Sequence, residues 1–137
     1  MIVVVGLLPS FLLGGCGWLT KSDLGKQEFE SKCATCHGMD GRGDGPQAEI
    51  LSIQPANLTI LAKQNGGVFP VKRVHAIIDG RLEVAAHGPR TMPIWGREFQ
   101  VNVPDLPVEA TGSVNYREDL VQGKIRALID YLKRIQE

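Results

Sequence analysis

The chain has 137 residues, with 15 basic and 15 acidic side chains and a formal net charge of zero. This length fits one domain of ordinary size, and the lack of a basic excess argues against a nucleic-acid binder. Glycine (16) and proline (8) are abundant, whereas the aromatic residues are few: four Phe, two Trp and two Tyr. The composition predicts a loop-rich domain in which a bulky bound group can supply missing apolar volume.

The first twenty residues, ending in "LLGGCGWLT", contain no charged side chain. We expect an export segment rather than a buried strand or helix. Leu13, Gly14 and Gly15 before Cys16 resemble a bacterial lipobox, which predicts a lipoprotein-like signal over residues 1–15, a lipid on Cys16 and a membrane tether over 16–22. The alternative is an uncleaved anchor, because ~20 apolar residues can span a bilayer. Either way, we expect residues 23–137 to lie outside the cytoplasm, on the periplasmic or outer face of a membrane.

The first helix is expected to begin at Ser22 or Asp23, since either side chain can cap it. Four residues recur along it at spacings of four, four and three, which places them on one helical face: Gly25, Phe29, Cys33 and Cys36.

The motif "CATCH" places Cys33, Cys36 and His37 together. A disulfide is possible in an oxidising compartment but leaves the histidine unexplained. A thioredoxin-like pair needs a βαβ context, which the flanking helix does not provide. A zinc site needs about four ligands, and no second cysteine pair is present to complete the set. The remaining interpretation is covalent haem c, with two thioether bonds from the cysteines and the imidazole of His37 on the iron.

The stretch from Gly38 to Gly45 contains four glycines and cannot continue a helix. A calcium loop suggested by Asp40 and Asp44 lacks the required acidic spacing. We expect the chain to leave the helix sharply and to wrap the edge of a flat ring. Residues 46–70 are predicted to be loop with one helical turn near residues 48–51. "VKRVHAIID" after Pro70 is predicted to be a helix that Gly80 ends.

The candidates for a second axial ligand are Met39, His75, His87 and Met92. Met39 is too near His37 to reach the opposite face of a ring, and His75 lies within a predicted helix. Met92 lies in a late loop directly before Pro93, a setting that favours it, with His87 as the alternative.

The remaining chain is predicted to contain a loop over residues 87–96, an irregular stretch over 101–116 and an amphipathic helix over 118–137. Apolar residues in that helix follow spacings of four, three, four and three: Val121, Ile125, Leu128, Leu132 and Ile135. No segment shows the alternation of a strand, so the fold class is predicted to be all-α.

With "CATCHG", "GRGDGP" and "MPIWG" in this order, the sequence resembles a class I c-type cytochrome of the bacterial mono-haem group. The resemblance implies a cytochrome c fold, in which the N- and C-terminal helices cross and loops wrap one covalent haem. It also implies His37 and Met92 as iron ligands. It further implies that Gly25, Phe29 and Tyr131 form the contact at which the two helices cross.

The same resemblance implies that a proline carbonyl accepts a hydrogen bond from the axial histidine, and Pro46 is the best match. Arg81, Arg90 and Trp95 are candidates for contacts to the haem propionates.

The function that these features predict is one-electron transfer without enzymatic activity, since His and Met together leave no vacant position on the iron. The expected partners are redox proteins, including membrane complexes. A second hypothesis is a fixed haem subunit of a larger respiratory or dehydrogenase complex. A third is a haem gas sensor or peroxidase in which Met92 leaves the iron.

Overall fold

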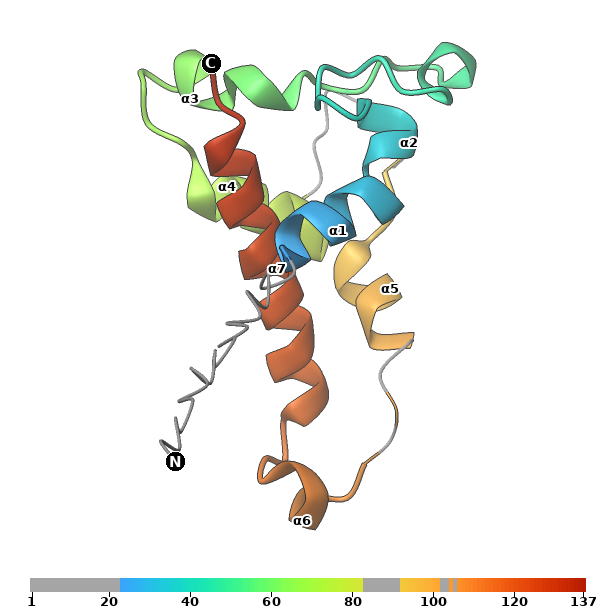
Figure 1. Cartoon of the computed structure of the whole chain (residues 1–137), viewed down its shortest axis with the longest axis vertical. Helices are drawn as coiled ribbons and strands as arrows, with labels where there is room; N and C mark the ends of the chain where they lie inside the picture. Colours follow the sequence, from blue (N-terminus) through green and yellow to red (C-terminus); the bar gives the residue numbers. More distant parts are fainter. Residues whose placement is uncertain (1–22, 83–91, 102–103, 105) are drawn as a thin grey trace, which may run out of the picture.

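The computed structural model describes residues 23–82, 92–101, 104 and 106–137, and within these it is helical with no strand (Figure 1). The prediction of an all-α fold is therefore confirmed. The predicted signal, the tether with Cys16, and the candidates His87 and Arg90 lie outside the described residues. The elements are α1 (Leu24–Lys32), α2 (Ala34–His37), η1 (Ala48–Ile50), η2 (Leu58–Ile60), α3 (Leu61–Gln64), α4 (Val71–Asp79), α5 (Trp95–Val101), α6 (Val108–Thr111) and α7 (Tyr116–Arg134).

Helix α7 forms the centre of the fold and is crossed by α1 (Figure 1). Its amphipathic pattern is the predicted one, and its buried residues are Val121, Ile125, Leu128, Ile129, Tyr131 and Leu132. Helix α1 begins where predicted, because the Asp23 carboxylate accepts a hydrogen bond of 3.1 Å from the Lys26 backbone N–H.

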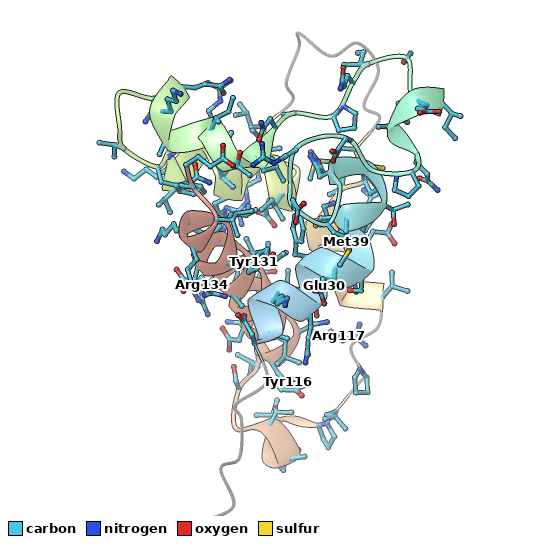
Figure 2. All side chains as sticks on the ribbon, turned by 45° about the horizontal axis from the view of Figure 1, so that its top comes forward. Glu30, Met39, Tyr116, Arg117, Tyr131 and Arg134 are labelled. Carbon is cyan, nitrogen blue, oxygen red and sulfur yellow. The ribbon has the colours of Figure 1, made fainter. Side chains whose placement is uncertain are left out.

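The two helices approach closely at Gly25, where a Cβ atom would lie 2.1 Å from the Ala127 carbonyl oxygen. The adjacent rings of Phe29 and Tyr131 pack with their centroids 5.1 Å apart. Figure 2 shows Tyr131 and Arg134 on the side of α7 next to α1, where Arg134 pairs with Asp23. The expected crossing of the N- and C-terminal helices is thus confirmed.

Helices α4 and α5 pack against α7 and complete the core. The boundaries of α4 match the prediction, with Gly80 ending it at a φ of 87°. The predicted loop over residues 87–96 includes the first two residues of α5, Trp95 and Gly96, which the structure places in a helix. Gly96 lies inside α5, and a Cβ atom there would lie 2.8 Å from the Asp79 carbonyl oxygen. This glycine therefore permits close packing of α5 on the end of α4 and does not mark a turn.

The first helix stops earlier than its apolar spacing suggests. Helix α1 ends at Lys32 and α2 begins at Ala34, with Cys33 as the link between them. Backbone hydrogen bonds still continue through the break, because the Cys33 N–H donates to Phe29 and the His37 N–H donates to the Cys33 carbonyl, both at 2.8 Å. Cys33 therefore lies at the junction of the two helices and Cys36 lies within α2, so the two cysteines do not share one face of a single helix.

The segment between α2 and α4 contains the predicted turn, η1, and two elements that were not predicted, η2 and α3. The C-terminal residues hold these two in place. The Gln136 side chain donates to the Leu58 carbonyl and accepts from the Ala62 N–H, and the Glu137 N–H donates to the Thr59 carbonyl. Figure 1 accordingly shows the C-terminus beside α3.

Helix α6 lies at the opposite end of α7 from α2 and α3 (Figure 1) and has no buried residue. It interrupts the stretch predicted to be irregular. Across the part of the chain that the structure describes, no helix is both long and apolar enough to cross a membrane.

Candidate functional site

A cavity of about 660 Å³ lies between α2, α4, α5, α7 and the segment 51–58. Its walls are largely apolar, and they include the two predicted attachment residues, Cys33 and Cys36, and the two predicted iron ligands, His37 and Met92. Apolar wall residues come from every surrounding segment, among them Phe29, Leu51, Leu58, Val74, Ile77, Ile78, Trp95, Leu128 and Leu132. The size is within the range of cofactor pockets, ~300–1,000 Å³.

The imidazole of His37 is fixed by a hydrogen bond of 2.9 Å between its Nδ1 and the carbonyl oxygen of Ala56. A carbonyl only accepts, so Nδ1 carries the proton and the lone pair of Nε2 is left free. Burial lowers the pKa of His37, and the hydrogen bond to Ala56 opposes this only in part. The lowered pKa favours the neutral form of the ring, which is the form that binds a metal.

The prediction that Pro46 supplies this carbonyl is wrong, because Ala56 does. Pro46 is exposed and does not line the cavity, whereas Pro55 and Ala56 do. Pro46 is the first proline after the motif, and the acceptor directly follows the second, Pro55. Asn57, which caps η2 by accepting from the Thr59 N–H at 2.9 Å, is a sequence signal that this segment is ordered.

The glycine loop brings this second segment to the histidine. The Gly43 N–H donates to the His37 carbonyl at 2.7 Å, and the Leu58 N–H donates to the Gly41 carbonyl at 2.7 Å. Gly43 has a φ of 87°, and a Cβ atom there would lie 2.3 Å from the Pro55 carbonyl oxygen. We expected the glycines of this loop to let the backbone approach the edge of a ring. At Gly43 the close approach is instead to the backbone of Pro55.

The two cysteines are half-buried and are not joined to each other by a disulfide. Burial raises the pKa of the Cys33 thiol to about 12, and the nearby Glu28 carboxylate acts in the same direction. The nucleophilic cysteine of a redox pair needs the opposite shift. The environment of Cys33 therefore does not suit that role.

The charged residues in the described cavity wall are Lys32 and Arg73, with no carboxylate among them. The indole Nε1 of Trp95, which also lines the cavity, is buried and has no hydrogen-bond partner. Buried N–H groups are normally paired. A largely apolar group that carries anionic oxygens fits this wall, because it would satisfy the indole N–H and face two cations.

The other sequence candidates lie elsewhere. Met39 is exposed, and His75 contacts the Gln122 side chain through Nε2 at 2.7 Å. Arg81 pairs with Asp79 and does not line the cavity, so Trp95 is the one propionate candidate that the described residues place there. Sequence reasoning missed Arg73, although it lies four residues before Ile77 and hence on the same helical face.

The chain belongs to the cytochrome c family, whose family model, described as "Cytochrome c", matches residues 22–136. Members of this family bind haem c covalently and serve mainly in electron transfer. A search of curated proteins and one of solved structures each gave no match.

Proposed function

We propose that this chain is a one-electron carrier that holds a single haem c through Cys33 and Cys36, with His37 and Met92 as the iron ligands. The observation that carries the proposal is the convergence of these four side chains on one apolar cavity. Bound haem c supplies reversible one-electron exchange at its iron. The family match supports haem-based electron transfer.

The surrounding residues have separate roles in this proposal. The Ala56 carbonyl orients His37 and increases the basicity of its Nε2. The apolar wall excludes water and so disfavours the additional charge of the oxidised iron. In this proposal the Trp95 N–H and the cations of Lys32 and Arg73 receive the propionates. The support is that all three residues line the cavity and that the indole N–H has no partner among the described protein atoms.

The test is Met92→Ala, with the exposed Met39→Ala as the matched control. We expect Met92→Ala to keep covalent haem, lose the sulfur-to-iron absorption band, lower the reduction potential and admit carbon monoxide to the reduced iron. Met39→Ala should match the wild type in all four properties. A wild-type spectrum and potential for Met92→Ala would refute methionine ligation, and His87 would be examined next. Carbon monoxide binding by the unaltered protein would support a gas sensor or peroxidase instead.

For location, we propose export followed by lipidation of Cys16, which would hold the haem domain at the periplasmic or outer face of a membrane. The support is the apolar N-terminal run that ends in "LLGGC". At least two acyl chains are needed for stable anchoring, at ~0.8 kcal/mol per buried methylene. The mass of the mature N-terminus is the test. A diacylglyceryl-modified Cys16 supports the proposal, an intact Met1 indicates an uncleaved anchor, and an unmodified terminus beyond Cys16 indicates a protein without a lipid.

A fixed subunit of a larger redox complex is the second candidate, and the segment around α6 favours it. Val101 and Val114 are 74% and 81% exposed, and Leu106 and Val108 of the same segment are also exposed. Exposed apolar side chains are typical of protein contacts where they gather in a patch. Purification from membranes in mild detergent separates the two candidates, because a carrier elutes alone and a subunit elutes with its partners.

A further inference from the structure

Glu28 on α1 is a buried acidic residue that has no part in the proposed haem attachment or iron ligation. Its side chain is 9% exposed and lies between two ammonium groups, with the Nζ of Lys32 at 3.1 Å and the Nζ of Lys124 on α7 at 3.0 Å. Acidic residues are rarely buried unless they are paired. We call these three residues the charge cluster, and their formal charges sum to +1.

The charge cluster lies at the wall of the cavity. Lys32 lines the cavity and directly precedes Cys33. The ammonium groups of Lys32 and Lys124 both lie over the ring of Phe99, at 5.7 and 5.3 Å from its centroid. Phe99 is fully buried and packs on Trp95 with a centroid distance of 6.1 Å. One member of the cluster, Lys32, therefore lines the cavity directly, and both ammonium groups lie against a buried aromatic ring. Buried apolar surroundings weaken an electric field less than water does.

Stability alone is a weak explanation for such a cluster. The free energy lost by desolvating a buried ion pair is about as large as the free energy gained from the attraction between its charges. Replacing such a pair with apolar residues often leaves the stability of a protein unchanged. The field of Glu28 also reaches the site, since its carboxylate helps to raise the pKa of Cys33.

We propose that the charge cluster sets the reduction potential of the bound haem, with the Glu28 carboxylate offsetting the two lysine charges beside the cavity. This inference rests on the proposed function, because it requires a haem in the cavity. Glu28 and Lys124 are positioning residues in this scheme. Neither contacts the iron, and each alters the relative stability of the two oxidation states through its charge.

The experiment measures reduction potentials of the haem-loaded protein and of the variants Glu28→Gln and Lys124→Gln. Glu28→Gln leaves a more positive cluster, disfavours the oxidised iron and should raise the potential. Lys124→Gln should lower it. Each shift should correspond to about a three- to tenfold change in the electron-transfer equilibrium constant, roughly 30–60 mV for a one-electron couple. The double variant restores the net charge of the cluster and should return close to the wild-type value.

The control is Glu30→Gln, which makes the same charge change on the same helix at an exposed residue paired with Lys26. Water screens this position, so its shift should be less than half that of Glu28→Gln. The opposite signs of the two shifts are decisive, because a loosened cavity admits water and would lower the potential in both Glu28→Gln and Lys124→Gln.

The result therefore separates the two proposals. The inference would be overturned, and the proposed function left standing, if both variants shift the potential in the same direction. The same holds if Lys124→Gln keeps the methionine absorption band of the haem and shows no shift in potential. Should Glu28→Gln fail to fold, Lys124→Gln is compared with Lys124→Arg, which keeps the charge at this partly exposed residue. A potential lowered in Lys124→Gln alone supports the inference, and an equal lowering in both variants would overturn it. A wild-type chain that binds no haem would overturn the proposed function and this inference with it.

Discussion

The crossing of α1 and α7 depends on Gly25, and Gly25→Ala measures how closely the two helices must approach. The added Cβ atom would lie 2.1 Å from the Ala127 carbonyl oxygen, 2.7 Å from its carbon and 3.0 Å from the Tyr131 Cβ. An ordinary C···O contact is ~3.3 Å, so the helices would have to separate by about 1.2 Å. Two of the three blocking atoms belong to the backbone and cannot rotate away.

The cost of this change follows from three contributions. Overpacking costs ~1–3 kcal/mol or more, with the upper end expected against backbone atoms. Separation also weakens the contact between Phe29 and Tyr131, which contributes ~0.5–1.5 kcal/mol beyond burial. Alanine in place of glycine in a helix returns ~1 kcal/mol. The net loss in the free energy of unfolding should be ~2–4 kcal/mol.

Gly123→Ala in α7 is the matched control, since a Cβ atom there would meet nothing within 4 Å. It should stabilise the protein by ~0.5–1 kcal/mol through helix propensity alone. The assay is urea unfolding of the haem-loaded protein followed by the circular dichroism of its helices, with unchanged m-values as the check on comparability. Equal stability of Gly25→Ala and the wild type, or equal losses in both variants, would refute the close-packing argument.

Three further predictions concern the cavity. Trp95→Phe should lower the unfolding free energy of the haem-loaded protein by ~1–3 kcal/mol, because the hydrogen bond proposed between the indole N–H, which has no partner among the described protein atoms, and a haem propionate would be lost. An unchanged value would show that the indole has no partner when haem is bound. Gly43→Ala pushes Pro55 away and should speed exchange of the His37 ring proton in NMR spectra, whereas unaltered exchange would contradict the role given to the loop. Burial raises the pKa of Glu28, but the lysines outweigh it and hold that pKa below the usual 4.5. The stabilisation by the charged Glu28 is therefore present above that value and is lost as the pH falls through the lowered pKa. Glu28→Gln should accordingly destabilise the protein at neutral pH, and the difference from the wild type should shrink in acid unfolding curves below about pH 4.5. A constant difference would argue that the shape of the side chain and not its charge is responsible.

Local sequence signals were sufficient for the elements whose boundaries are set by their own residues. Asp23 caps α1, Gly80 ends α4, and the apolar spacing of α7 matches its buried face. These features act over one or two helical turns, so they can be recognised without knowledge of the neighbours. The spacing of the cysteine pair and histidine likewise predicted three residues that line the cavity.

Tertiary contacts decided the rest. Gly96 looks like a turn signal and instead lies within α5, because α5 must pack against the carbonyl of Asp79. The acceptor for His37 is Ala56 and not Pro46, because the glycine loop folds back and brings a later segment to the ring. The i, i+4 spacing of Glu28 and Lys32 is visible in the sequence, but their third partner, Lys124, reaches them only through the helix crossing. Hydrogen bonds and charge contacts between distant segments depend on how the helices pack, and no local pattern encodes that packing.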